Sequence, residues 1–289
     1  MLHTCAMKAS IIGKRRGRPL SLIATSQAAL DVMAHVRDEI YETEQPVVMV
    51  TVVRAVGSNP QHVGARMLLL TNGEIRGTVG GGRIESHLIR DAQTLLEEGG
   101  APQLLSYNLQ EIGMTCGGVM DFFLERIDPA PHLVIFGGGH ISQPTAALAA
   151  NVGFRVTVID ERTDWANPER FPTATVINQP FPEFLDTFVP QPSHFLVMVS
   201  QGHAHDKIIL ERLIDGPQRY TGVIGSKQKA HKLWKELKNA GIDEALWEKV
   251  NCPMGLPIGG RTPEEIAVSI VGQLIETRRG PNVWKKKET

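Results

Sequence analysis

The chain has 289 residues, 42% hydrophobic and 21% charged, a composition that is typical of globular proteins and excludes wholesale disorder. The 30 Lys and Arg residues are balanced by 31 Asp and Glu residues, which argues against a protein that coats nucleic acid or an anionic membrane. No apolar run reaches the length of about 18 residues that a transmembrane helix needs. Cys5, Cys116 and Cys252 make no disulfide framework, and without a secretory signal they favour the cytoplasm.

At roughly 150 residues per domain, the length predicts about two domains. Residues 1–24 are basic and lack periodicity, so we expect a disordered extension. Residues 25–128 are expected to form a small α+β domain, in which Asn72-Gly73 marks a hairpin turn. Its expected helices are 27–44 and 83–98, and its expected strands are 47–53, 66–70, 75–79, 103–107 and 119–126.

The segment Asp128-Pro129-Ala130-Pro131 is the expected linker, because closely spaced prolines favour a stiff, extended connection. After it, a strand, a helix and a strand within about 28 residues form a βαβ unit, which implies a parallel sheet. The predicted strands are 133–136, 155–159, 195–199 and 221–225, and the predicted helices are 142–152, 206–214 and 227–240. A last helix begins at Thr262-Pro263 with a capping box to Glu265. The sequence thus predicts an α/β protein with a Rossmann-like second domain, 132–279, and a tail, 280–289.

The turn after the first strand of the second domain carries a candidate phosphate site. Residues 137–142 read Gly-Gly-Gly-His-Ile-Ser, which fits the G-x-G-x-x-G dinucleotide fingerprint except for serine at the third glycine. Asp160 ends the next strand, where an acid commonly bonds a ribose 2′-hydroxyl. We therefore expect Gly137, Gly139, His140 and Asp160 to contact a nucleotide-like or phosphate-bearing ligand. The alternative is a tight turn with no ligand.

The first domain offers two further candidates. Gly80, Gly81 and Gly82 lead into a predicted helix, where exposed backbone N–H groups bind anions, and Arg83 and Glu85 follow them. A flexible turn is the alternative interpretation.

Cys116 is followed by Gly117 and Gly118, and a neighbouring basic group or helix N-terminus would favour its thiolate. The alternative for Cys116 is a buried small hydrophobe.

Three more candidates lie in the second domain. His203, His205 and Asp206 suit ligand binding, proton transfer or helix capping better than metal binding, because closely spaced residues rarely supply three tetrahedral ligands.

Gly225 and Ser226 precede a helix with two lysines, and Arg261 precedes the last helix after a glycine-rich loop. Both patterns favour an anion, although an ordinary capped loop explains them as well.

Eight segments form an ordered set of motifs: 53–60, 63–67, 79–85 and 114–118 in the first domain, and 134–140, 202–206, 222–226 and 258–267 in the second. This set resembles the xanthine dehydrogenase accessory (XdhC/CoxI) family, and the resemblance spans residues 27–278. It implies a chaperone, often a homodimer, that binds the molybdenum cofactor as molybdopterin or a dinucleotide form. Such a chaperone supports sulfuration with a cysteine desulfurase, delivers the cofactor to a molybdenum hydroxylase client, and has no independent catalytic activity.

Under this resemblance Cys116 would contact molybdenum or handle sulfur, because a soft thiolate suits that chemistry. Many family members carry cysteine where Arg83 stands, so Arg83 leaves Cys116 without a second cysteine. Two alternatives remain open: an NAD(P)-dependent oxidoreductase with His203 or His205 as acid–base, and a nucleotide or redox sensor that regulates partners.

Overall fold

The computed structural model describes residues 20–200 and 202–280. The chain divides into two compact units, Met1–Ile127 and Asp128–Thr289, and each is described by itself. The division falls at the first residue of the expected linker. The predicted fold class is confirmed, because the first unit holds an antiparallel sheet and the second a parallel one. Among the described helices, none combines the length and apolar composition that a membrane span requires.

From residue 20 onward, where the structure describes it, the first unit contains two helices and five strands. They are α1 (Leu20–Thr43), β1 (Val47–Val56), β2 (Arg66–Leu69), β3 (Ile75–Gly77), α2 (Gly82–Glu98), β4 (Gln103–Asn108) and β5 (Val119–Ile127). The sheet order is β3-β2-β1-β5-β4 with every pair antiparallel. Residues 20–24, which we expected in a disordered extension, belong to α1; the rest of that extension lies outside the described residues.

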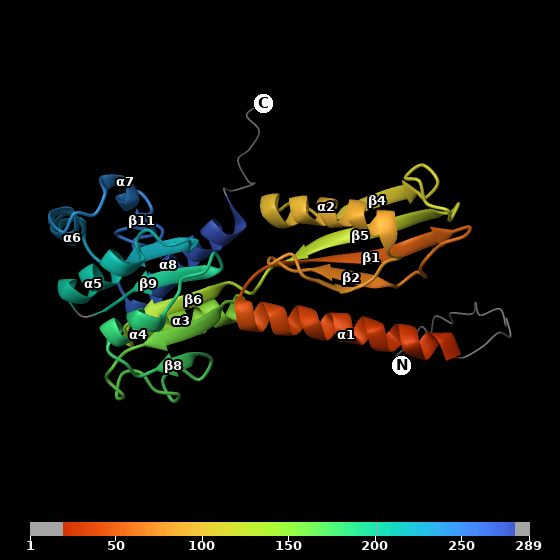
Figure 1. Cartoon of the computed structure of the whole chain (residues 1–289). Helices are drawn as coiled ribbons and strands as arrows, with labels where there is room; N and C mark the ends of the chain where they lie inside the picture. Colours follow the sequence, from red (N-terminus) through yellow and green to blue (C-terminus); the bar gives the residue numbers. More distant parts are fainter. Residues whose placement is uncertain (1–19, 201, 281–289) are drawn as a thin grey trace, which may run out of the picture. The chain divides into compact units, whose positions relative to one another are not determined.

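The sheet of the first unit is covered on both faces. Side chains alternate along a strand, so Val48 and Val50 on β1 pack in one core with Leu88 of α2. Val47 packs in the other core with Val36 of α1. Figure 1 shows α2 and α1 on opposite sides of this sheet. Because both faces are buried, β1 reads as a continuous apolar run.

The predicted Asn-Gly hairpin joins β2 to β3, but its geometry differs from a two-residue loop. Gly73 N–H donates to Leu70 O at 3.0 Å, and Leu70 N–H donates to Glu74 O at 3.0 Å. Of the turn residues only Gly73 has a positive φ, at 82°. This pattern is a type I turn closed by a glycine bulge, and glycine is needed there because other residues avoid positive φ.

The second unit contains six strands and six helices within the described residues. They are β6 (His132–Phe136), α3 (Ser142–Asn151), β7 (Arg155–Ile159), β8 (Thr175–Ile177), α4 (Phe181–Thr187), β9 (His194–Met198), α5 (His203–Leu213), β10 (Tyr220–Val223), α6 (Lys227–Asn239), α7 (Glu244–Trp247), β11 (Val250–Asn251) and α8 (Pro263–Arg279). The sequence did not predict β8, α4, α7 or β11, because these elements are too short to show a periodicity. The predicted capping box of α8 is confirmed.

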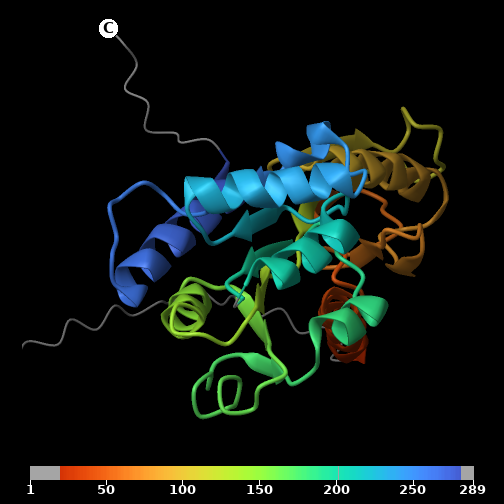
Figure 2. The ribbon, with the colours of Figure 1, turned by 90° about the vertical axis from the view of Figure 1, so that its left-hand side faces the viewer.

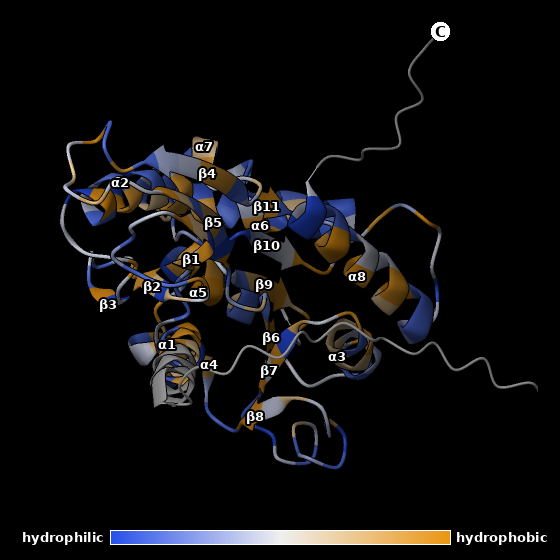
Figure 3. Ribbon diagram, turned by 90° about the vertical axis from the view of Figure 1, so that its right-hand side faces the viewer, coloured by the Kyte–Doolittle hydropathy of each residue, from blue (hydrophilic) through white to orange (hydrophobic). Residues whose placement is uncertain are grey.

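The strand order is β11-β10-β9-β6-β7-β8, with every pair parallel. Helices α3 and α8 cover one face of the sheet, and α4, α5 and α6 cover the other, as Figure 2 shows. The adjacent strands β6 and β7 are mostly hydrophobic (Figure 3). This is the Rossmann order, in which ligands bind beyond the carboxyl ends of the strands where the order reverses. Here that point lies between β6 and β9.

Candidate functional site

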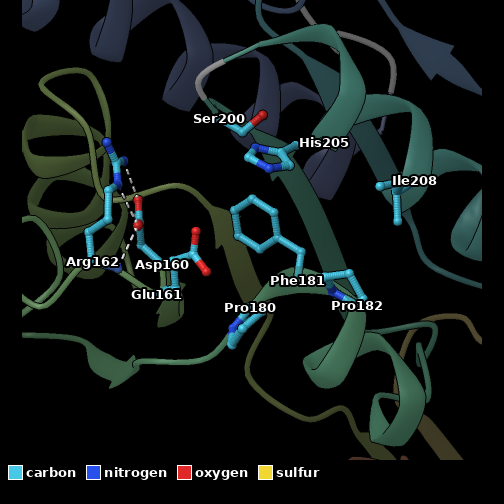
Figure 4. Close-up of a pocket in the computed structure, with 9 residues that line it drawn as sticks. All are labelled: Asp160, Glu161, Arg162, Pro180, Phe181, Pro182, Ser200, His205 and Ile208. Carbon is cyan, nitrogen blue, oxygen red and sulfur yellow. Dashed lines mark hydrogen bonds and ion pairs between the residues drawn. The ribbon is translucent and has the colours of Figure 1, made fainter.

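A cavity of about 370 Å³ lies at the carboxyl edge of the parallel sheet. Its walls come from segments that are distant in sequence: Asp160, Glu161 and Arg162 after β7, Phe181 at the start of α4, Ser200 after β9, and His205 on α5. Figure 4 shows these side chains around the cavity. Of the candidate residues predicted from the sequence, Asp160 and His205 therefore share one site.

The glycine-rich turn after β6 lies against two walls of this cavity. A Cβ atom on Gly137, whose φ is +110°, would lie 3.0 Å from Ser200 Cα. Gly138 donates its N–H to Asp160 Oδ2 at 2.8 Å, and a Cβ there would lie 2.7 Å from Trp165 O. The first two glycines thus permit close loop packing. The space beside Gly139 is open, since a Cβ there would meet no atom within 4 Å.

Serine replaces the third glycine of the fingerprint without disturbing the turn. Ser142 is fully buried, and its hydroxyl donates to the carbonyl oxygen of Gly137. The nearby His140 is exposed and packs its ring edge against Trp165, with centroids 4.9 Å apart. The predicted strand–turn–helix unit is therefore present, with a hydroxyl bond closing the turn.

The Asp160 carboxylate is hydrogen-bonded within the protein. Its Oδ1 accepts from Arg162 N–H at 3.0 Å and Arg162 Nε at 2.9 Å, and its Oδ2 accepts from Gly138 and from Arg162 Nη2 at 2.6 Å. Burial opposes ionisation, but the Arg162 guanidinium and these N–H groups hold the pKa of Asp160 below its usual value. All the acceptor positions of the carboxylate are engaged. In the structure Asp160 therefore braces the loop against the glycine turn, and its expected contact with a ribose stays a prediction.

The neighbouring Glu161 was not a candidate in the sequence, yet it lines the cavity. It is exposed and makes no hydrogen bond to a described residue. Its carboxylate turns toward Phe181, while that of Asp160 turns toward Arg162 (Figure 4). Phe181 contacts the His205 ring edge-on, with centroids 5.2 Å apart. The adjacent acids at the strand end were the available signal for Glu161, but nothing in the sequence indicated Phe181.

A buried ion pair lies behind Ser200. Asp206 is 0% exposed, its Oδ1 accepts from Ser200 Oγ at 2.7 Å, and its Oδ2 lies 2.6 Å from Lys229 Nζ. Lys229 also donates to Ile224 O at 2.9 Å. Asp206 therefore does not cap α5, whose N-cap is Gly202 without a side-chain bond. The side chain of His203 lies outside the described residues.

The loop after β10 supports this lysine rather than presenting an open anion site. Ser226 caps α6 as predicted, accepting from Lys229 N–H at 3.2 Å. A Cβ on Gly225 would lie 2.5 Å from Lys229 Cδ, so glycine leaves room for the lysine chain.

Burial raises the pKa of the Cys252 thiol to about 11, although the charge of Lys229 opposes the rise.

At the N-terminus of α8, the carboxylate of Glu265 takes the position that an anionic ligand would occupy. Arg261 is exposed, and its backbone N–H donates to Glu265 Oε2 at 2.7 Å. Thr262 N–H donates to the same oxygen at 3.1 Å. Arg261 does not line the cavity described above.

In the first unit, the carboxylate of Glu85 likewise binds backbone N–H groups of the glycine turn at residues 79–82. Glu85 Oε1 accepts from Val79 N–H at 3.0 Å, Gly81 N–H at 2.9 Å, and the hydroxyl of Thr78. Partial burial opposes ionisation, but these hydrogen bonds hold the pKa of Glu85 below its usual value. The expectation that Gly80–Gly82 offers its N–H groups to a ligand is corrected for Gly81, whose donor is engaged by Glu85.

Arg83 contacts the segment 109–118, here called the Cys116 loop. Its Nη1 donates to Ile112 O at 3.2 Å, and a Cβ on Gly113 would overlap that guanidinium. On the far side of the loop, a Cβ on Gly118 would overlap the Asn59 side chain and the carbonyl oxygens of Val56 and Ser58. Cys116 is a free, half-buried cysteine packed at the edge of the core beneath α2. The structure therefore brings Arg83 and the loop that bears Cys116 together.

Known proteins share both units. Residues 40–108 match the XdhC and CoxI family, and residues 133–274 match the XdhC Rossmann domain. The uncharacterized protein YqeB of Escherichia coli is 30% identical over 247 residues, which are 83% of this chain and 45% of that protein. A probable xanthine dehydrogenase subunit of Bacillus subtilis is 35% identical over 160 residues, which are 55% of this chain and 46% of that protein. The chain thus spans less than half the length of these curated relatives.

A solved structure supports the fold. A crystal structure described as a xanthine dehydrogenase from Bacillus halodurans aligns with a TM-score of 0.50 and 23% sequence identity, over 90% of this chain and 98% of that one. The family expected from the ordered motifs is confirmed by the two family matches, which together cover most of the chain. The chain belongs to the XdhC and CoxI family, and its second unit carries the XdhC Rossmann domain.

Proposed function

We propose that the chain is an accessory factor for a molybdenum hydroxylase of the xanthine dehydrogenase type. In this proposal it binds the molybdenum cofactor as cargo, supports its sulfuration, and hands it to the client enzyme. Family membership supports the accessory role, as does the Bacillus subtilis relative named for xanthine dehydrogenase. A cysteine desulfurase would supply the sulfur, and the factor would act as a cytoplasmic homodimer with no turnover of its own.

The observation that carries the proposal is the Cys116 loop with Arg83 against it. The Cys116 thiol is half-buried on a glycine-rich backbone and so is partly exposed, and a thiolate is a soft ligand that suits molybdenum. The Arg83 guanidinium adds a fixed positive charge to the same loop, and guanidinium groups bind oxyanions and phosphate in a bidentate manner. The donor types present therefore fit a molybdenum–pterin cargo that carries a phosphate.

The test measures pterin bound to the full chain after purification from a molybdenum-replete host, by the fluorescence of the oxidised pterin. Cys116→Ala is expected to lose most of the bound pterin and the ability to activate a cofactor-free client hydroxylase. Cys252→Ala is the matched control, because both are free cysteines of intermediate burial, and it should retain both properties.

Two results would contradict the proposal: no pterin even after reconstitution, or unchanged retention and delivery by Cys116→Ala. An NADH titration of the same preparations tests the oxidoreductase alternative. That alternative requires saturable binding together with hydride transfer to an acceptor, in which His205 would act as the acid–base group.

A further inference from the structure

The outer edge of β4 carries backbone groups that no described strand pairs with. β4 ends the sheet order of the first unit, and β5 is its partner on the inner side. Leu109 N–H donates to Gly118 O, and hydrogen-bonded pairs alternate along an antiparallel ladder. In the register of β4 with β5, Leu105 therefore directs its backbone groups to β5, whereas Leu104 and Ser106 direct theirs outward.

The sheet face beside this edge is apolar and partly open. Within the first unit, α1 packs mainly on β1, β2 and β3. On the same face, Leu104 of β4 is 70% exposed and lies opposite Phe123 of β5, which is half-buried. Thr51 of β1 continues this row. Contiguous exposed apolar side chains beside an open strand edge mark an interaction surface.

No charge protects the edge. Residues 99–110, which include all of β4, contain no Asp, Glu, Lys or Arg, in a chain that is 21% charged. Natural proteins usually block an exposed edge with charged side chains or by keeping the edge strand short. The opposite edge of the same sheet follows that rule, because β3 is three residues long and carries Arg76. β4 is therefore the edge that is suited to pairing with another strand.

The composition of this edge favours a second copy of the same chain as its partner. In a two-fold symmetric interface, residues near the axis face the same residues of the other copy. A charged residue there would face its own like charge, which destabilises strand pairing. β4 avoids this repulsion, whereas an edge that selects a foreign acidic or basic strand is expected to carry complementary charge.

The directions of the backbone groups also define a register. Antiparallel pairing about an axis at Leu105 sets Leu104 of each copy opposite Ser106 of the other, and each of these pairs exchanges two N–H···O bonds. Leu104 then lies between Phe123 of its own copy and Ser106 of the other. The Cys116 loops follow β4 at opposite ends of the paired strands. The two copies of Asn108 lie six positions apart along them, about 20 Å.

We propose that two copies of the chain pair through their β4 edges, antiparallel and centred on Leu105, and that this pairing covers Leu104 and Phe123. The inference rests on the proposed function in that it gives the homodimer named there an interface. The pairing joins the two five-stranded sheets into one continuous sheet. Because the Cys116 loops lie away from the axis, dimerisation leaves them open to cargo.

The first experiment measures the dimer dissociation constant of the full chain by sedimentation equilibrium over a dilution series. Leu104→Lys should raise this constant about a hundredfold, roughly tenfold for the apolar contact that each copy loses. Lysine is also the residue that most often blocks a strand edge. Val189→Lys is the matched control, because Val189 is an apolar side chain of the second unit that is 68% exposed, and it should leave the constant unchanged.

A second pair of variants tests the backbone. Ser106→Pro and Ser106→Ala both lose the hydroxyl that donates to Asp121, but only proline removes the outward N–H. Proline is tolerated on an edge strand where that N–H is not used within the sheet. Ser106→Pro should raise the dissociation constant at least about tenfold, and Ser106→Ala less than about twofold.

Hydrogen exchange of the wild type reads the register without any substitution. The amides of Leu104 and Ser106 should be protected in the dimer and exchange quickly on dilution to the monomer. The Leu105 amide, which points to β5, should stay protected in both states. This alternation decides the question if Ser106→Pro does not fold.

The inference is overturned if the wild type is a monomer at every concentration, or if Leu104→Lys dissociates no more readily than Val189→Lys. Protection of the Leu104 and Ser106 amides in a monomer also overturns it, because another segment of the chain then covers the edge. Pterin retention separates this inference from the proposed function. A monomer that retains and delivers pterin removes the interface alone, whereas a dimer that depends on Leu104 and binds no pterin supports the interface and contradicts the proposed function.

Discussion

Removing either member of the Asp206–Lys229 ion pair should destabilise the second unit much more than removing both. Asp206 is 0% exposed, Lys229 is 16% exposed, and their charged atoms lie 2.6 Å apart. When one partner is removed, the remaining charge is unpaired and is still buried away from water. Lys229→Met and Asp206→Leu should therefore each cost about 3–5 kcal/mol, the usual effect of breaking a buried pair.

The double variant removes both charges at once. Only the Ser200 hydroxyl and the Ile224 carbonyl then lose a partner, which costs roughly 1–3 kcal/mol. The double variant should thus be more stable than either single variant. For a unit of this size, 1 kcal/mol corresponds to about 2–4 °C in Tm, so each single variant should lower the Tm by roughly 6–20 °C.

The assay is a double-mutant cycle by calorimetry of the full chain, which follows the transition of the second unit. Lys207→Met is the matched control, because Lys207 pairs with Glu211 at 3.3 Å on the same helix with side chains 35% and 31% exposed. Such an exposed pair should contribute less than about 1 kcal/mol. The reasoning is wrong if the losses of stability in the two single variants add up to the loss in the double variant. It is also wrong if either single variant loses no more stability than Lys207→Met.

Two further predictions follow from pKa shifts. The pKa of Glu85 is lowered in the folded state, so its contribution is present at neutral pH and is lost as the pH falls through the folded value. Glu85→Gln should destabilise the first unit by about 1–2 kcal/mol at pH 7 and by progressively less toward pH 3. Denaturant titrations measure this loss of stability, and an equal loss at both pH values would contradict the prediction. Burial raises the pKa of Cys252 from 9.0 to about 11, so at pH 8 iodoacetamide should alkylate it about a hundredfold more slowly in the folded chain than in urea, because the thiolate is the nucleophile. Mass spectrometry gives both rates, and equal rates would refute the shift.

The arrangement of helices and strands was readable from the sequence where the pattern is local. The apolar run of β1, the βαβ unit that begins at β6 and the capping box at Thr262 all occur as predicted. Each depends on residues within a few positions of one another. The short elements β8, α4, α7 and β11 escaped prediction because too few residues show a period, and α4 contributes Phe181 to the cavity.

Part of the geometry that the glycine fingerprint predicts is present. The turn at Gly137–Ser142 and the acid that ends β7 lie together at the carboxyl edge of the sheet, as the fingerprint implies. What the pattern did not indicate is which groups are already engaged. Asp160 bonds Gly138 and Arg162, and Glu85 bonds the turn that precedes its own helix.

The sequence by itself determined the α/β class and the Rossmann-like second domain, because hydrophobic period and turn residues are properties of neighbouring residues. The family followed from the resemblance of its ordered motifs and is shown by the two family matches. Only the tertiary structure decided which carboxylates have partners inside the protein. That choice depends on close approach between distant segments, such as Lys229 against Asp206 and Gly137 against Ser200. The physical reason is that a buried polar group must find a partner, and which partner is within reach depends on the packing of the whole domain.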